Sequence, residues 1–289
     1  MVARSILKLV KDELPKVEYI DYKDKIELYY KNSKGGQPKA VIVKKYLSLD
    51  ESFFEGLGLY IGECERSKSG KALSFTNTNI DILRFIILWL DKYFGIEKKE
   101  LSVTIISPKV PDTEYLNKKW SQILDLDNSQ FTKPSFPISN PGNLERARIF
   151  RNKILYRVIL ESTFRNILPL CFMHIEWGNG FLRGYYAAEG YPLIRKRRLG
   201  EVSVASKDLE VLTIVKRLLL NRGILSNIKR CEEGRNKDGQ YELKVFSFKS
   251  FKKLDEINLF KLHDKRKALF IEGLSKFKYA GMPESGQTG

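Results

Sequence analysis

Two short stretches of the chain, GLGLYIGEC at 56–64 and LRGYYAAEG at 182–190, resemble each other. When they are superimposed, Gly58 falls on Gly184 and Glu63 falls on Glu189. The offset between the glutamates is 126 residues (189 − 63 = 126). Because a duplicated structural unit leaves an internal repeat of this kind, we interpret the chain as two copies of one fold unit.

Similar patterns follow each stretch. The first is followed by a strand-like KALSFTNT and an amphipathic helical segment that stops at Gly95. The second is followed by the strand-like YPLIRKRR and EVSVAS and a helical segment that stops at Gly223. The distance from glutamate to glycine is 32 residues in one copy (95 − 63) and 34 in the other (223 − 189). Thr78 and Ser206 are the predicted N-caps of these helices, and the two glycines are the predicted C′ residues.

These patterns predict an α+β fold of two pseudo-symmetric units, each with the order helix, two strands, helix, two strands, helix (αββαββα), packed through their paired first helices. The first unit carries an insertion at about 108–144, with a helix expected over 114–124. The predicted divisions are a basic N-terminal leader with short strands (1–50), a first unit (51–165), a linker (166–179), a second unit (180–280) and a tail (281–289).

The chain is strongly basic. Lys and Arg number 51 against 35 Asp and Glu, which gives a formal net charge of +16, and the excess is spread over both halves. A body this positive favours a polyanion partner, because each Lys or Arg that neutralises a phosphate releases counterions. No apolar run is long enough to span a bilayer and no signal sequence opens the chain, so we expect a soluble, cytoplasmic protein.

Cysteine and histidine are scarce. Cys64, Cys171 and Cys231 stand far apart with no CxxC pair, and His174 and His263 are the only histidines. This usage argues against a disulfide framework, a zinc site and any His-rich metal centre.

Small residues recur at a spacing of four in both repeated stretches, which places them on one helix face. Glycine in a helix interior costs about 1 kcal/mol relative to alanine, so its presence needs a packing reason. A second helix of the same design, approaching closely, supplies that reason. The predicted helix-interface residues are Gly58, Gly62, Gly184 and Ala188.

Each predicted helix ends in an acidic residue, at the end where the helix dipole disfavours negative charge. If the two helices pack side by side, Glu63 and Glu189 also repel each other. A divalent cation between them would relieve both penalties, and hard oxygen ligands suit Mg²⁺. A metal-bound water could then attack a phosphodiester. The alternative is an ordinary small-residue helix contact with two exposed glutamates.

The two stretches, with the strand and helix order after each, resemble the LAGLIDADG homing endonuclease family in its single-chain form with two motifs. The resemblance covers about residues 48–275. It implies two αββαββα units whose sheets form a saddle over double-stranded DNA, and cleavage of both strands of a long, specific site, as in intron homing. The implied cofactor is Mg²⁺, with Mn²⁺ as an alternative and Ca²⁺ expected to support binding without cleavage.

The resemblance also assigns roles. Glu63 and Glu189 fall at the family's acidic, metal-binding position, with the backbone carbonyls of Gly62 and Ala188 as further metal ligands. Cys64 departs from the family, because a glycine usually follows the acid. The further catalytic residues implied are Asn79 and Lys207, near the position that orients water, and His263, near a basic position.

The sheets are expected to supply the DNA contacts. Arg and Lys can read guanine edges or hold phosphate, and the alternation of apolar and polar residues selects those that face outward. The candidate DNA-binding residues are Ser74, Thr76, Arg146, Arg148, Arg195, Arg197, Ser203, Lys229 and Lys244.

The main alternative is a nucleic-acid binder of the same fold that does not cleave, including an intron RNA maturase. Two acids at the motif positions favour cleavage over binding alone. Intein splicing is not expected, because the sequence starts with Met1 and ends in SGQTG. The internal repeat already supplies the symmetry of a dimer, so we expect a monomer, and the unequal copies predict an asymmetric target.

Overall fold

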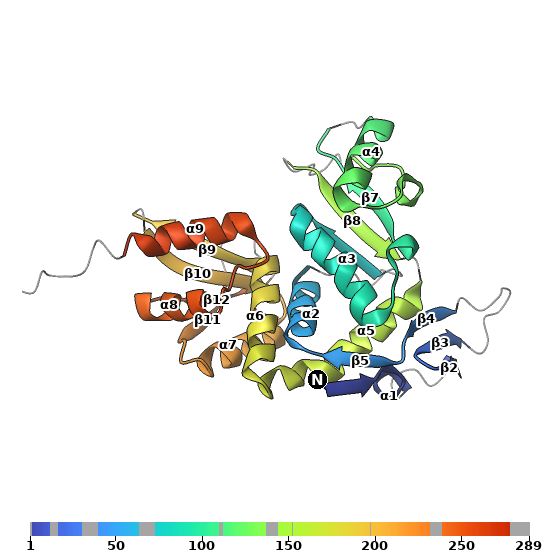
Figure 1. Ribbon diagram of the computed structural model, residues 1–289. Helices are drawn as coiled ribbons and strands as arrows, with labels where there is room; N and C mark the ends of the chain where they lie inside the picture. The colour runs from blue at the N-terminus through green and yellow to red at the C-terminus, as the bar shows by residue number, and fades with distance from the viewer. Residues whose placement is uncertain are drawn as a thin grey trace, which may run out of the picture.

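The computed structural model describes residues 2–11, 17–30, 40–63, 73–109, 112–136, 144–151, 153–196, 198–231 and 239–277. Two αβ units stand on either side of a central pair of helices, α2 and α6, and short N-terminal strands pack beside the first unit (Figure 1). The α+β class predicted from the sequence is confirmed. No helix among the described residues is long and apolar enough to cross a membrane.

The first unit is built on a three-stranded sheet. Its elements are α2 (Glu51–Glu63), β6 (Leu73–Asn77), α3 (Ile80–Phe94), η1 (Lys98–Glu100), β7 (Ser102–Ile106), β8 (Arg146–Arg151) and α5 (Ile154–Ile167). The insertion between β7 and β8 holds α4 (Thr113–Leu124), as expected, and η2 (Asn128–Gln130). The stretch between α2 and β6, residues 64–72, lies outside the described residues.

The second unit is built on a four-stranded sheet. Its elements are η3 (Leu168–Phe172), α6 (Ile175–Glu189), β9 (Gly190–Arg195), β10 (Arg198–Ser206), α7 (Leu209–Leu220), β11 (Ser226–Arg230), β12 (Tyr241–Val245), α8 (Phe248–Glu256) and α9 (Asp264–Ser275). Helix α6 begins at Ile175, before residue 180, where the sequence patterns start the second unit. Helix α9 is an addition that those patterns did not reveal.

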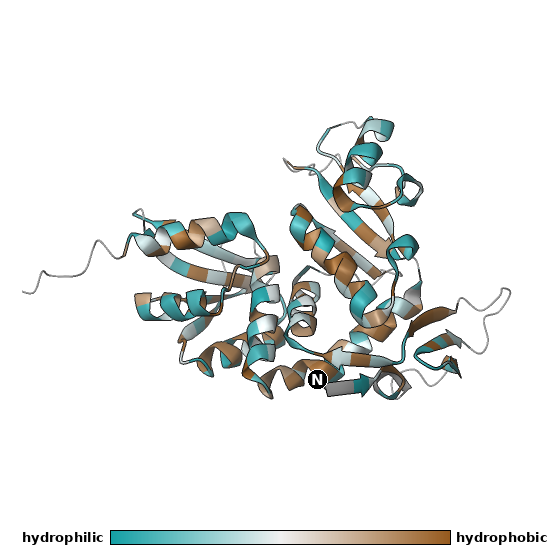
Figure 2. Cartoon of the chain, in the orientation of Figure 1, coloured by the Kyte–Doolittle hydropathy of each residue, from teal (hydrophilic) through white to brown (hydrophobic). Residues whose placement is uncertain are grey.

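The two sheets have matching antiparallel topologies. Their strand orders are β6-β8-β7 and β9-β10-β12-β11. Strands β6 and β10 lead into the equivalent helices α3 and α7, so β8 corresponds to β12 and β7 to β11. Brown and teal alternate along the strands of both units (Figure 2), and the apolar residues pack towards the helices. This match is the structural counterpart of the repeat in the sequence.

The caps of α3 and α7 differ from those predicted. Asn79, not Thr78, accepts backbone N–H groups at the start of α3, and Asp208, not Ser206, does so for α7. Asn and Asp are at least as good at this position as Thr and Ser, so a shift of one or two residues has little cost. Gly95 ends α3 with a φ of 70°, in the left-handed conformation that glycine adopts most readily.

The described residues of the N-terminal leader form short strands and one helix. The leader contains β1 (Val2–Ser5), α1 (Ile6–Lys11), β2 (Val17–Asp21), β3 (Lys25–Tyr30), β4 (Val41–Lys44) and β5 (Tyr46–Leu49). Strands β2, β3 and β4 form one antiparallel sheet, and β1 pairs with β5. Lys153 Nζ donates to the Ala40 carbonyl at 2.8 Å, which ties the leader to the first unit.

Candidate active site

Helices α2 and α6 pack backbone against backbone. A Cβ atom added at Gly184 would lie 1.8 Å from the Glu55 carbonyl oxygen, and one at Gly58 would lie 2.2 Å from the Phe181 carbonyl oxygen. No other side chain fits at either position without separating the helices. The contact runs along the whole pair, because a Cβ at Gly180 would lie 2.2 Å from the Glu51 carbonyl oxygen.

The same contact brings the two helix ends together. A Cβ added at Gly62 would lie 2.4 Å from Ala188 Cβ and 3.4 Å from Glu189 Cγ. Glu63 and Glu189 are the last residues of α2 and α6. The structure therefore places the two repeated glutamates beside each other at one end of the helix pair.

Both carboxyl groups are disfavoured as anions. Burial raises the pKa of Glu63 to about 8, and the negative charge of Glu189 adds to the effect. Burial also raises the pKa of Glu189. The Arg266 guanidinium lies close enough to lower the pKa of each, but it does not cancel the effect of burial. The site therefore has a deficit of positive charge when both groups are ionised.

A side chain on the neighbouring strand holds Glu63 in place. Asn77, the last residue of β6, donates from Nδ2 to Glu63 Oε1 at 2.7 Å. Its Oδ1 accepts from the backbone N–H of Asn79, also at 2.7 Å. Both ends of the amide are thus fixed, and its N–H is directed at the carboxylate. The sequence patterns did not single out Asn77.

Arg266 of α9 closes the end of α6. Its Nη1 donates to the carbonyls of Tyr186, Ala187 and Ala188, at 3.2, 2.6 and 3.1 Å. They lie at a helix C-terminus, where a cation is favourable, and the Tyr186 carbonyl also accepts from the Gly190 N–H. The Ala188 carbonyl, expected from the resemblance to hold metal, therefore already accepts a hydrogen bond from arginine.

The oxygen donors at this end suit a hard divalent cation. Two carboxylates supply the charge, and Mg²⁺ typically keeps several waters and takes its other ligands from substrate phosphate. No group of three or more His, Cys, Asp or Glu side chains that could hold a metal lies within the described ranges. The residues present thus fit a cation shared with substrate and water rather than one enclosed by protein.

Two of the other residues expected to assist catalysis cap helices. Asn79 Oδ1 accepts from the N–H groups of Asp81 and Ile82 as the cap of α3. His263 caps α9, with Nδ1 accepting from the Arg266 N–H at 3.4 Å, and burial lowers its pKa to about 4. Lys207 is exposed in the turn between β10 and α7.

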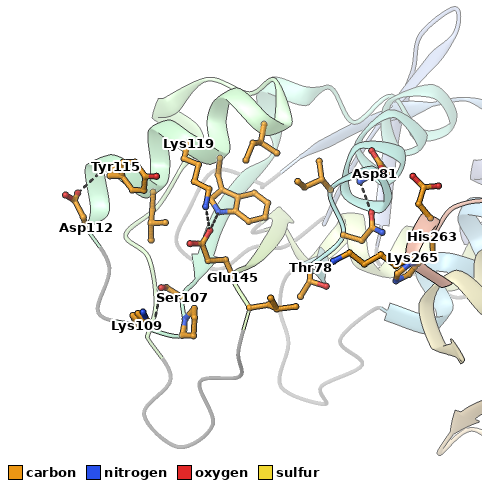
Figure 3. A pocket seen from close by; sticks show the side chains of 18 residues that line it. Thr78, Asp81, Ser107, Lys109, Asp112, Tyr115, Lys119, Glu145, His263 and Lys265 are labelled. Atoms are coloured by element: carbon orange, nitrogen blue, oxygen red, sulfur yellow. Dashed lines mark hydrogen bonds and ion pairs between the residues drawn. The ribbon is translucent and has the colours of Figure 1, made fainter. Parts of the chain in front are cut away.

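Asn79 and His263 share a cavity rather than the carboxylate site. The cavity, of about 830 Å³, lies between the start of α3, helix α4 and the start of α9. In Figure 3, His263 and Lys265 of the second unit lie near Thr78 and Asp81 of the first. The cavity therefore spans the two units beside the helix ends.

Comparison with known proteins gives a family match for the second unit. Residues 176–257, from α6 to α8, match the family model of the LAGLIDADG-like domain. The second unit is therefore similar to the LAGLIDADG-like domain. No curated protein matches the chain.

Three solved structures match the chain at low sequence identity. The crystal structure of I-DmoI in complex with DNA and Mn is 17% identical over 72% of this chain and 97% of that chain, with a TM-score of 0.42. The N-terminal LAGLIDADG domain of DUF199/WhiA is 15% identical over 74% of this chain and 83% of that one, with a TM-score of 0.44. Full-length DUF199/WhiA from Thermatoga maritima is 15% identical over 82% of this chain and 62% of that chain, with a TM-score of 0.46.

Polar residues of the first sheet form a row across its strands. Thr76 of β6 pairs with Arg148 of β8, which pairs with Thr104 of β7. The apolar residues between them point to the opposite, helix-covered face. Ser74, expected to face outward, is only 3% exposed because Arg148 Nε donates to its hydroxyl at 2.8 Å. Arg146 pairs with Ile106 at the end of β7, on the same face.

The sheet of the second unit carries an equivalent row. Ser203 of β10 pairs with Tyr191 of β9 and with Lys244 of β12, which pairs with Asn227 of β11. Lys229 is exposed on β11, two residues further along the same face. The row therefore runs across all four strands.

An acidic residue that the sequence patterns did not single out lies on this face. Glu201 is 4% exposed and accepts from Arg195 Nη2 and from Lys244 Nζ, each at 3.1 Å. The two predicted DNA-binding cations are therefore already paired with protein. Arg197, another candidate, lies outside the described residues.

Proposed function

We propose that the chain is a site-specific endonuclease that hydrolyses phosphodiesters of double-stranded DNA at a long, asymmetric site. The observation that carries this proposal is the position of Glu63 and Glu189, side by side at the ends of two helices in backbone contact. A buried carboxyl pair with raised pKa values lowers the stability of the folded protein when both groups are ionised, and such pairs are characteristic of functional sites.

Glu63 and Glu189 are the proposed catalytic metal ligands, assisted by the Gly62 carbonyl. Mg²⁺, or Mn²⁺ in its place, would supply an acidified water and stabilise the charge that develops on the leaving oxygen. Asn77 orients the Glu63 carboxylate, and Arg266 fixes the end of α6 that carries Glu189. Ca²⁺ is expected to support DNA binding without cleavage.

The polar faces of the two sheets are the proposed DNA-binding surfaces. The proposed DNA-binding residues of the first unit are Thr76, Arg146 and Arg148. Those of the second unit are Ser203 and Lys229. Their positive charge favours phosphate, and their position on strands allows contact with base edges in the major groove. The two faces differ in sequence, so a monomer would bind an asymmetric site.

A second candidate is a nucleic-acid binder that does not cleave, with intron RNA among its ligands. One observation favours it. The Arg266 guanidinium occupies the Ala188 carbonyl and lies close to both carboxylates, so a protein cation already offsets part of their charge. In that case the helix ends would need no metal.

The experiment that separates these functions is a selection from a randomised double-stranded DNA library in Mg²⁺, in Ca²⁺ and in EDTA. Cleaved and retained molecules are sequenced for the wild type, Glu63→Gln and Glu189→Gln. Glu97→Gln is the matched control, because Glu97 lies on the first unit's surface and pairs with the exposed Lys99.

The endonuclease proposal predicts cutting at one asymmetric site in Mg²⁺, lost in both site variants and kept in Glu97→Gln. It also predicts that the site variants still bind that site. Specific retention without cutting in any metal would overturn the endonuclease and leave the binder. Structured intron RNA would then be the next ligand to measure.

A further inference from the structure

The insertion of the first unit adds an extra edge to its sheet. After α4 and η2, the chain runs parallel to β7, with bridges between Phe131 and Val103 and between Ser135 and Ile106. The Thr132 N–H donates to the Val103 carbonyl at 2.8 Å. The Ser135 N–H donates to Ile105, also at 2.8 Å, and its carbonyl accepts from Ser107 at 2.9 Å. We call residues 131–135 the edge segment.

Neighbouring contacts fix the edge segment firmly. Phe131 is 8% exposed and belongs to the hydrophobic core. Just before it, Gln130 Nε2 donates to the carbonyls of Lys98 and Leu101, at 2.6 and 2.8 Å. A capping box at Asp127 sets the direction of the chain into this turn. Backbone hydrogen bonds to β7 and the buried Phe131 side chain therefore hold the segment in place, as they would hold a strand.

The edge segment continues the polar face of the sheet. The hydroxyls of Thr132 and Thr104 lie 2.5 Å apart, and Thr104 belongs to the row that includes Arg148 and Thr76. Lys133 and Ser135 of the edge segment are exposed. The row of polar side chains thus extends one position beyond β7.

Three acidic residues of the insertion have other partners. Asp125 pairs with Lys98, and Glu145 pairs with Lys119, which is also visible in Figure 3. Asp112 caps α4. The edge segment itself carries one charged side chain, the cation Lys133, and no acid.

In the second unit, the connection between the equivalent strands is too short for a similar insertion. Its equivalent strands, β11 and β12, are joined by residues 231–240, whereas β7 and β8 are joined by residues 107–145. The shorter connection cannot supply a helix, a turn and a further edge. The extension is therefore particular to the first unit.

We propose that Thr132 and Lys133 contact DNA beyond the β7 edge, so that the first unit recognises more base pairs than the second. The proposal rests on DNA binding by the sheet faces, as proposed above. Thr132 is placed to reach a base edge, directly or through water, and Lys133 to neutralise a phosphate. The insertion thereby determines specificity at one end of the target.

The test is a binding-site selection from randomised double-stranded DNA in Ca²⁺, with the full chain. The variants are the double substitution Thr132→Val and Lys133→Ala, and the control Lys118→Ala. Lys118 is exposed on α4, which packs on the helix side of the sheet, so this control also removes one positive charge from the insertion. Thermal unfolding verifies that each variant is folded.

The double variant should lose base preference at contiguous positions at one end of the site, and its affinity for the wild-type site should fall about tenfold. The slope of log affinity against log salt should decrease by about 1, because one phosphate contact is lost. Lys118→Ala should leave the base preferences unchanged.

A double variant with the base preferences and affinity of the wild type would overturn this inference while leaving DNA binding intact. A wild type that selects no DNA sequence would overturn the proposed function, and this inference with it. The two failures are therefore distinguishable in one experiment.

Discussion

The Asn77 side-chain amide and the Glu63 carboxylate are joined by a hydrogen bond, with Nδ2 and Oε1 2.7 Å apart. Asn77 is in turn fixed by the backbone N–H of Asn79. This arrangement joins the last residue of a strand to the last residue of a motif helix. It gives Asn77 a positioning role, because the amide determines where the carboxylate points.

Asn77→Ala should therefore slow cleavage by about 10- to 100-fold at saturating Mg²⁺ while the protein stays folded. The matched control is Asn79→Ala. It removes the cap of α3 and should lower the free energy of unfolding by about 1 kcal/mol without a comparable loss of cleavage rate. Single-turnover cleavage and urea unfolding of both variants measure the two effects. A larger cleavage defect in Asn79→Ala would contradict the assignment.

The sequence alone predicts Glu63 and Glu189, but it does not predict Asn77, which orients Glu63. Glu63 and Glu189 occupy the same place in two copies of a repeat, so each supports the other. Asn77 belongs to a polar run, and the chain alone does not tell which of its members reaches the helix end. The packing of β6 against α2 decides this, since it places the Asn77 amide within hydrogen-bond distance of Glu63.

Arg266 could not be placed from the sequence for a different reason. It lies on α9, 77 residues after Glu189 (266 − 189 = 77), and no copy of this helix accompanies the first repeat. Similarly, Ser74 has the outward position that alternation predicts, but Arg148 covers it. Repetition and periodicity are visible along the chain, whereas long-range contacts of single side chains are not.

The raised pKa of Glu63 should make the metal-free protein less stable as pH rises. The folded state favours the protonated acid up to about pH 8, whereas the unfolded chain releases the proton near pH 4.5. The stability is therefore fully present below pH 4.5 and is lost as pH rises through 8. Glu63→Gln removes this dependence, because the amide does not ionise.

In EDTA, Glu63→Gln should thus exceed the wild type in free energy of unfolding by roughly 2 kcal/mol at pH 9, after allowance for partial exposure of the side chain. The two should converge near pH 4.5. Thermal or urea unfolding across this range provides the measurement, with Glu97→Gln expected to follow the wild type. Parallel curves for Glu63→Gln and the wild type would show that the carboxyl is not perturbed.

A buried ion pair crosses between the two units. Arg183 of α6 donates from Nε to Glu55 Oε1 at 2.9 Å and from Nη2 to Glu51 Oε1 at 2.7 Å. By the repeat offset of 126, Glu55 corresponds to Phe181 (181 − 55 = 126) and Arg183 to Leu57 (183 − 57 = 126). The pair therefore exists only when α2 meets α6, and it distinguishes this pairing from that of two identical units.

Glu55→Gln should lower the free energy of unfolding by about 3 kcal/mol, because the buried Arg183 would lose its buried carboxylate partner and keep only the more exposed Glu51. Replacing both residues by methionine should recover most of the loss, as hydrophobic replacements of buried pairs usually do. A double-mutant cycle by urea unfolding gives the coupling energy. Additive single and double effects would indicate that the pair contributes no mutual stabilisation.

The motif helices α2 and α6 approach each other most closely at Gly184, where even a methyl group is predicted to be destabilising. A methyl group there would lie 1.8 Å from the Glu55 carbonyl oxygen, which belongs to a helix backbone and cannot move alone. Gly184→Ala should therefore force α2 and α6 apart, lower the free energy of unfolding by about 3 kcal/mol and disturb the Glu63–Glu189 site.

The control is Gly178→Ala on the same helix, where the nearest atoms to a new Cβ lie 3.0 Å away and one of them ends the flexible Leu218 side chain. Its gain in helix propensity opposes the crowding, so its stability should stay within about 1 kcal/mol of the wild type. Urea unfolding of the two variants compares identical chemical changes in one helix. Equal stabilities would mean that the backbones at Gly184 are not in contact, and the carboxylates that the contact brings together would lose their structural basis.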